Sequence, residues 1–280
     1  MKSILYSARL CMAAYGDMPG LVHADLMGVV GVSDPETGVD GFVFIARESR
    51  TLHIVFRGSE SPVQKSGRID WLNNLMVLKT DFHGIRCHRG VVRCTLSVLD
   101  QVTDIIAMYP GWSLTLQGHS AGGNVATLVA VALCDKFAGE PGVQIRLITF
   151  GQSRVSSAQA LASKLWCDYI RVQNGSDAVC RWPKLGYGDY GTNLYFPNSS
   201  RLGAWMINPH IWVQRRDILF STIGRVLDHR MNEYTDRVAR VVEDEAMCGV
   251  DAGEGRAASN RNGSFLGGGL HTGPKRADFR

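Results

Sequence analysis

The chain has 280 residues, of which 45% are hydrophobic and 20% are charged, and its formal net charge is +4. This composition is typical of a globular protein with a large buried core and speaks against long-range disorder. No basic stripe with interleaved aromatic residues supports nucleic-acid binding, and no apolar run approaches the roughly 20 residues of a transmembrane helix.

The N-terminal segment, residues 4–15, predicts an amphipathic helix that ends near Gly16. Arg9 interrupts its apolar stretch and Asp17 follows soon after, which speaks against a cleavable signal peptide. We therefore expect a cytoplasmic protein, with export by a signal-independent route as the alternative. The seven cysteines form no Cys-x-x-Cys pair. We expect reduced, mostly buried thiols and no metal site, and a secreted protein with one or two disulfides is the alternative.

The middle of the chain alternates predicted strands and helices. Short runs rich in Val, Ile and Phe predict strands at residues 41–46, 51–56, 112–117, 145–150 and 169–172. Apolar residues at helical spacing predict helices at residues 90–108, 122–137, 156–165, 211–227 and 231–247. A hairpin or an extended loop is expected at residues 187–197. This alternation predicts an α/β fold, with a mostly parallel central sheet that helices cover on both faces.

The composition changes at Gly249, after which Gly, Ala, Ser, Asn and Arg dominate. Such a segment lacks the apolar residues needed to build a packed core. We therefore expect one domain over residues 1–248 and a flexible Gly-rich tail over residues 249–280.

A Gly-x-Ser-x-Gly motif occupies residues 118–122, between a predicted strand and a predicted apolar helix. In that context the motif predicts a nucleophile elbow, where Ser120 is exposed at the end of a strand and at a helix N-terminus. Gly118 and Gly122 allow the tight turn, and backbone N–H groups there can stabilise negative charge. The alternative is a Gly-rich junction that only permits close packing. We expect His119 to pack beneath the nucleophile.

A serine nucleophile requires a base, and histidine is the usual base near neutral pH. Serine hydrolases with this elbow place the acid and then the histidine after the serine in the chain. Three histidines follow Ser120, namely His210, His229 and His271. We exclude His271 because it lies in the Gly-rich tail. His229 is favoured because it lies at the junction of two predicted helices, and His210 is the alternative.

Asp177 is the favoured acid because it follows the predicted strand at residues 169–172 and would reach the same edge of the sheet as the elbow. Asp168 precedes that strand and would lie at the opposite edge. Asp189 and Asp217 remain alternatives, and Asp177 could also be a simple turn residue beside Gly175.

Several ordered blocks of the chain resemble the class 3 lipases, a family that includes filamentous-fungal triacylglycerol lipases. The blocks are IVFRGS at residues 54–59, DWLNNL at 70–75, CHRG at 87–90, LQGHSAGG at 116–123, TFGQSRV at 149–155, RVQNGSD at 171–177 and DHRMNEY at 228–234. The resemblance implies the α/β-hydrolase fold and a catalytic triad of Ser120, Asp177 and His229. It also implies an oxyanion hole formed by Ser59 and Ala121, and a movable lid at about residues 60–78.

Motif and resemblance together predict a carboxylic ester hydrolase that forms an acyl-enzyme on Ser120, with acylglycerols or related lipid esters as substrates. No metal or cofactor is implied. The lid is expected to contact lipid surfaces transiently. The alternatives are a phospholipase A, an acyltransferase and a catalytically silent hydrolase fold used as a binding module.

Overall fold

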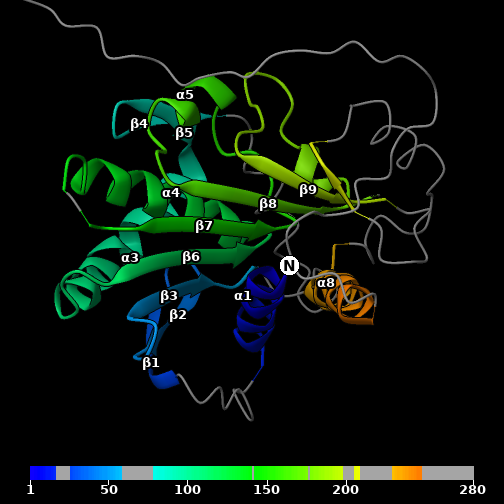
Figure 1. Cartoon of the computed structure of the whole chain (residues 1–280). Coiled ribbons are helices and arrows are strands. Elements are labelled where there is room, and N and C mark those ends of the chain that lie inside the picture. Colours follow the sequence, from blue (N-terminus) through cyan, green and yellow to red (C-terminus); the bar gives the residue numbers. More distant parts are fainter. Residues whose placement is uncertain are drawn as a thin grey trace, which may run out of the picture.

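A computed structural model describes residues 1–16, 26–58, 78–140, 142–175, 177–197, 205–208 and 229–247. An eight-stranded sheet runs through its centre in the order β1-β2-β3-β6-β7-β8-β9-β10 (Figure 1). The strands are β1 (Leu26–Asp34), β2 (Val39–Ala46), β3 (Thr51–Phe56), β6 (Ser113–His119), β7 (Ile145–Phe150), β8 (Asp168–Asn174), β9 (Thr192–Phe196) and β10 (Met206–Ile207). The five central strands, from β3 to β9, pair in parallel, and the outer pairs are antiparallel.

Helices lie on both faces of this sheet, as predicted. One face packs against α3 (Arg89–Ala107) and α4 (Ala121–Lys136), and the other packs against α1 (Lys2–Ala13) and α8 (Met231–Met247). Figure 1 shows α1 and α8 side by side, although they come from opposite ends of the described chain. The remaining elements are a hairpin of β4 (Lys79–Phe82) and β5 (Ile85–His88), the short helix α5 (Ala158–Ala162) and the 3₁₀ turn η1 (Val179–Arg181).

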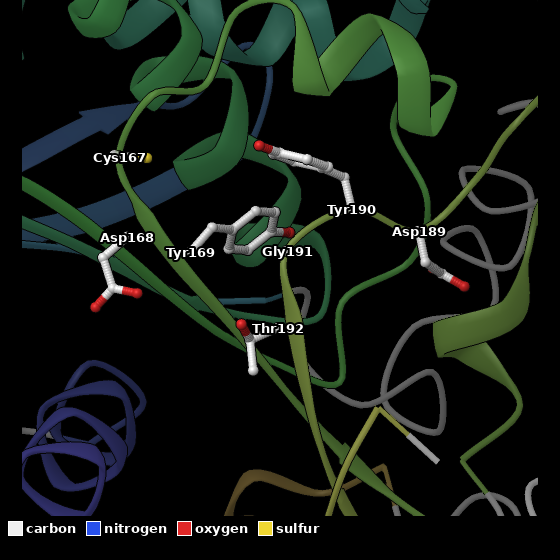
Figure 2. A pocket seen from close by; sticks show the side chains of 7 residues that line it. All are labelled: Cys167, Asp168, Tyr169, Asp189, Tyr190, Gly191 and Thr192. Atoms are coloured by element: carbon white, nitrogen blue, oxygen red, sulfur yellow. The ribbon is translucent and has the colours of Figure 1, made fainter. Parts of the chain in front are cut away.

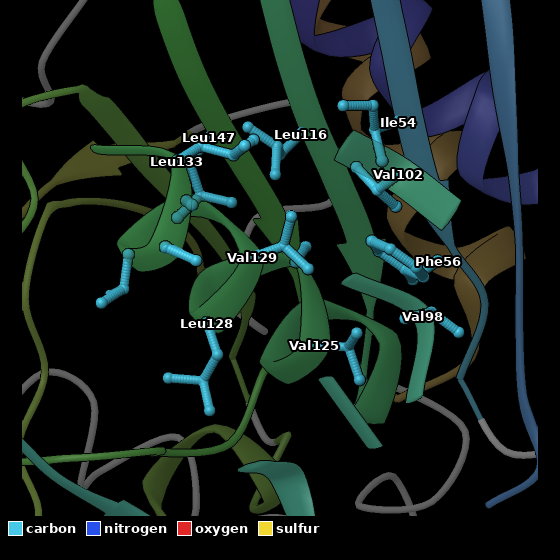
Figure 3. Close-up of a cluster of buried hydrophobic side chains, with 14 of the residues drawn as sticks. Ile54, Phe56, Val98, Val102, Leu116, Val125, Leu128, Val129, Leu133 and Leu147 are labelled. Carbon is cyan, nitrogen blue, oxygen red and sulfur yellow. The ribbon is translucent and has the colours of Figure 1, made fainter. Parts of the chain in front are cut away.

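The larger core lies beneath α4, whose small apolar residues allow it to approach the sheet closely. Val125, Val129 and Leu133 of this helix pack with Leu116 of β6 and Leu147 of β7 (Figure 3). Side chains alternate between the faces along each strand. On β7, Ile145 and Leu147 therefore lie in this core, whereas Ile148 and Phe150 lie in the core formed with α1 and α8. The elbow strand β6 and the helix α4 pack together in the larger core, which fixes the position of the elbow between them.

The structure confirms most of the predicted elements. The strand at residues 145–150 and the helix at residues 231–247 have the predicted bounds, and the first helix and those at 90–108 and 122–137 agree within two residues. Two predictions were wrong. The helix expected at residues 156–165 shortens to Ala158–Ala162, and part of the hairpin or extended loop expected at residues 187–197 is β9, a strand parallel to β8. The predicted helix at residues 211–227 and the tail at residues 249–280 lie outside the described residues.

The structure describes six of the seven cysteines. All six are free, and five of them are buried. Among the helices described here, none combines the length and apolarity needed to cross a bilayer.

Candidate active site

The Gly-x-Ser-x-Gly motif forms a sharp turn between β6 and α4. Ser120 joins the two elements with a positive φ of 53°, which is a strained conformation for a residue other than glycine. A Cβ atom on Gly122 would lie 2.2 Å from the carbonyl oxygen of Phe56, and one on Gly118 would lie 2.5 Å from the carbonyl of Gly122. Only glycine fits at either position, so the motif is required by this turn.

The side chains of Ser120, His229 and Asp177 form one continuous hydrogen-bonded series. Nε2 of His229 lies 2.8 Å from Oγ of Ser120, and Nδ1 of His229 lies 2.8 Å from Oδ2 of Asp177. Because a carboxylate only accepts hydrogen bonds, Nδ1–H donates to Asp177. Nε2 is then left with a lone pair for the hydroxyl hydrogen of Ser120. The three predicted residues therefore meet in the geometry of a serine nucleophile with its base and acid.

Asp177 is fully buried and is surrounded by donors. Besides the imidazole, Tyr234 donates its hydroxyl hydrogen to Oδ2 at 2.6 Å, and the N–H of Val179 donates to Oδ1 at 2.9 Å. A buried carboxylate is costly unless it is hydrogen-bonded, and these contacts offset that cost. Tyr234 belongs to one of the family-like blocks, but no sequence pattern indicated its contact with Asp177.

The end of β7 passes close to the Asp177–His229 pair. Gly151 has a φ of 58°, and a Cβ atom placed there would lie 3.0 Å from Oδ2 of Asp177 and 3.2 Å from Nδ1 of His229. Any larger residue would therefore press on the atoms that hold the imidazole in place.

The predicted oxyanion hole lies only partly within the described residues. Ala121 is the first residue of α4, so its N–H belongs to the helical turn whose N–H groups have no intrahelical acceptor. Ser59 and residues 60–77 of the predicted lid lie outside the described residues.

The alternative acids are engaged elsewhere. Asp189 forms ion pairs with Arg154, at 2.7 Å, and with Arg171. Burial opposes the charge on Asp189, but hydrogen bonds from Arg154 and the attraction of both arginines lower its pKa. Asp168 begins β8 and pairs with Arg146 at the opposite edge of the sheet, as predicted. The remaining candidates, His210, Asp217 and His271, lie outside the described residues.

His119 is buried beneath the nucleophile, as predicted, but its contacts were not predicted. Its Nδ1 lies 2.7 Å from the hydroxyl oxygen of Tyr15, and its Nε2 lies 2.7 Å from the carbonyl oxygen of His229. Burial is the main reason why the pKa of His119 falls to about 3, and the electrostatic effect of the nearby His229 lowers it further. His119 is therefore neutral at ordinary pH.

A cavity of about 430 Å³ lies away from Ser120, His229 and Asp177, and Figure 2 shows the side chains that line it. Residues 167–169 and 189–192 line it, near the beginnings of β8 and β9. Ser120 follows the carboxyl end of β6, so the cavity is at the opposite edge of the parallel sheet. Within the part of the chain that the structure describes, no cluster of three or more His, Cys, Asp or Glu side chains is arranged to hold a metal ion.

Comparisons with known proteins agree with this geometry. Residues 53–187 match the family described as Lipase (class 3). The chain is 26% identical over 210 residues to a secreted alkaline triacylglycerol lipase of Penicillium cyclopium, which covers 68% of this chain and 69% of that protein. It is 32% identical over 102 residues to phospholipase A1-II 1 of Oryza sativa subsp. indica, over 35% of this chain but only 26% of that protein.

The fold resembles that of the native Rhizomucor miehei lipase propeptide complex. The TM-score is 0.59 at 24% sequence identity, with 71% of this chain and 69% of that chain covered. This likeness confirms the predicted α/β-hydrolase fold.

The comparisons also correct the prediction of a cytoplasmic location, because the Penicillium cyclopium relative is a secreted lipase. That prediction depended on the interrupted apolar stretch at residues 4–15. In the structure this stretch forms α1, whose Ile4, Leu5 and Leu10 are buried in the core with α8. A segment that the fold needs as a core helix gives no information about the compartment. The family match over residues 53–187 and the fungal lipase relatives together support the class 3 lipase family for this chain.

Proposed function

We propose that this protein cleaves carboxylic ester bonds of acylglycerols or related lipid esters through an acyl-enzyme on Ser120. The observation that carries the proposal is the series Ser120–His229–Asp177, with both hydrogen bonds at 2.8 Å. It gives the hydroxyl a base within proton-transfer distance, and it gives that base a buried carboxylate to orient it.

In the proposed mechanism, Nε2 of His229 takes the hydroxyl proton as Oγ of Ser120 attacks the ester carbonyl. The negative charge moves to the carbonyl oxygen, where the N–H of Ala121 and donors of Ser59 stabilise it. The bond to the alcohol then breaks, and the alcohol leaves with the proton from Nε2. Water, activated by the same nitrogen, releases the acid and restores Ser120.

Asp177 keeps the hydrogen on Nδ1 of His229 throughout this cycle and stabilises the imidazolium that forms. The position of Ser120 before α4 adds a second contribution. Ser120 is the N-cap residue of α4, yet its hydroxyl makes no capping bond and faces His229 instead. The positive end of the helix dipole supports the developing oxyanion.

A phospholipase A1 is the second candidate, favoured by the similarity to the rice enzyme. The same three residues can serve either substrate, because both carry a carboxylic ester bond. We expect the substrate preference to depend on residues 59–77, which contain the predicted lid and its proposed contact with lipid surfaces.

The experiment compares hydrolysis of p-nitrophenyl butyrate, an emulsified triacylglycerol and phosphatidylcholine vesicles. The wild-type protein should hydrolyse the soluble ester, and Ser120→Ala should reduce kcat by at least about 1,000-fold. Ser163→Ala, at the exposed end of α5, is the matched control and should keep full activity. The ratio of the two lipid rates separates lipase from phospholipase. Full activity in Ser120→Ala, or a wild-type protein inert on all three substrates, would contradict the proposal.

A further inference from the structure

We propose that Tyr15 and His119 form a positioning pair that fixes the backbone of Gly58 and the backbone of the base, His229, relative to Ser120. This inference rests on the proposed function, and no motif in the sequence points to it. It concerns side chains that do not touch the substrate but determine where the reacting groups stand.

Three hydrogen bonds link four distant parts of the chain. The N–H of Gly58, just after β3, donates to the hydroxyl oxygen of Tyr15 at 2.7 Å. The same hydroxyl lies 2.7 Å from Nδ1 of His119. Nε2 of His119 lies 2.7 Å from the carbonyl oxygen of His229. A single series of bonds therefore runs from Gly58 through Tyr15 and His119 to the backbone of the base.

The direction of every bond in this series is determined. The carbonyl oxygen of His229 can only accept, so Nε2 of His119 must carry the hydrogen. His119 is neutral because it is buried, so its Nδ1 has a lone pair and accepts the hydroxyl hydrogen of Tyr15. Burial also raises the pKa of Tyr15, which keeps this hydroxyl protonated. The oxygen of Tyr15 then accepts from Gly58, so each donor faces one acceptor.

One end of the series reaches the segment expected to bind the oxyanion. Gly58 directly precedes Ser59, the predicted oxyanion-hole residue. Its backbone is packed tightly, because a Cβ atom on Gly58 would lie 2.6 Å from the hydroxyl of Tyr15 and 2.9 Å from Cβ of Ser120. The position of Tyr15 therefore sets how close the backbone of Gly58 comes to the nucleophile.

The other end of the series holds the base. The rings of His119 and His229 lie 5.0 Å apart between centroids, and both nitrogens of His119 are occupied by the bonds described above. His119 therefore has no free nitrogen to exchange protons with Ser120. Its role is to fix the backbone from which the imidazole of His229 extends.

The test is Tyr15→Phe, which removes one oxygen and leaves both Gly58 N–H and His119 Nδ1 without this partner. We expect kcat per active site for p-nitrophenyl butyrate to fall about 10- to 100-fold with little change in KM, since small displacements of reacting groups have effects of this size. Titration with a fluorophosphonate, taken to completion, counts the folded active sites and removes any loss due to unfolding. Tyr6→Phe makes the same change on α1, where Tyr6 packs against His53, and should leave kcat unchanged.

A double-mutant cycle tests whether the two residues act as a unit. In His119→Gln the amide can still reach the carbonyl of His229 but offers Tyr15 no ring nitrogen. If the pair acts as one, the Tyr15→Phe/His119→Gln double variant should be no slower than the slower single variant. Multiplying effects, or an unchanged kcat per labelled site in Tyr15→Phe, would overturn the inference. A wild-type protein that neither labels nor hydrolyses esters would instead contradict the proposed function, and this inference with it.

Discussion

The hydroxyl of Tyr234 and Nδ1 of His229 share a single oxygen of Asp177, at 2.6 Å and 2.8 Å. The carboxylate is fully buried, so no solvent can replace either contact. Tyr234 also accepts the N–H of Asn174 at 3.2 Å, which ties it to the end of β8. The tyrosine therefore helps to fix the oxygen toward which the imidazole points.

Tyr234→Phe should lower kcat by about 10-fold and reduce the free energy of unfolding by about 1–3 kcal/mol, because a buried carboxylate loses a donor. Steady-state kinetics and urea denaturation measure the two effects. Tyr190→Phe is the control, since its hydroxyl donates to the carbonyl of Leu165 at 3.3 Å beside the distant cavity. A Tyr234→Phe variant that matches Tyr190→Phe in kcat would show that Tyr234 does not position Asp177.

Gly151 and Gly111 allow backbone strain and steric contact to be separated. Both have positive φ, 58° and 73°, but a Cβ atom on Gly111 would meet nothing within 4 Å. Each Gly→Ala substitution should reduce the free energy of unfolding by about 1–2 kcal/mol through the left-handed conformation alone. Only Gly151→Ala should also lower kcat, by about 10-fold or more, because its methyl group would displace Asp177 or His229. Equal kcat values for the two variants would argue against this packing constraint.

Asp177→Asn and Asp189→Asn distinguish the proposed acid from its alternative. Asp177→Asn should lower kcat by about 10,000-fold, because the amide no longer holds the imidazole in its working tautomer. Asp189→Asn should leave kcat nearly unchanged. It should instead reduce the free energy of unfolding by about 1 kcal/mol, because the buried Arg171 loses a carboxylate partner that is itself 45% exposed and therefore screened by solvent. Kinetics and urea denaturation on both variants check this, and the reverse pattern would move the acid to Asp189.

The buried His119 makes stability depend on pH. Its pKa falls from 6.5 to about 3 on folding, so between these values the unfolded chain binds more protons than the folded one. The stability that His119 contributes is complete above pH 6.5, and it is lost at up to about 1.4 kcal/mol per pH unit as the pH falls toward 3. In the His119→Gln variant, the side chain at this position does not bind a proton in this pH range. The difference in unfolding free energy between wild type and variant should therefore shrink on acidification from pH 7 to pH 5, and a constant difference would contradict a neutral buried His119.

Local sequence patterns predicted those strands and helices in which buried apolar residues recur at the regular spacing of a strand or a helix. The strand at residues 145–150 and the helix at residues 231–247 carry apolar residues at the spacing of their own structure, and both have the predicted bounds. β1 was not predicted because it is an edge strand with exposed Met27 and Val29 and two glycines, so apolar and polar residues do not alternate along its sequence. Residues 187–197 were expected to form a hairpin or an extended loop. The pairing of β9 with β8 was not predicted because it depends on a distant segment.

The residues of the site also fall into two groups, those that local sequence patterns predicted and those that they did not. Ser120 could be predicted because the elbow is a local turn, and Asp177 and His229 followed from chain order and from the ends of predicted elements. Tyr15 and His119 are 104 residues apart and meet only because α1 packs against the same sheet that carries the elbow. No periodicity or short motif records such a contact, so it becomes visible only in three dimensions.

The most direct test of the account is to locate the covalent adduct that a fluorophosphonate forms with the wild-type protein, using peptide mass spectrometry. The account predicts one phosphonyl group per chain, carried by Ser120, and no adduct in Ser120→Ala. Modification of a different residue, or equal labelling of Ser120→Ala, would contradict it.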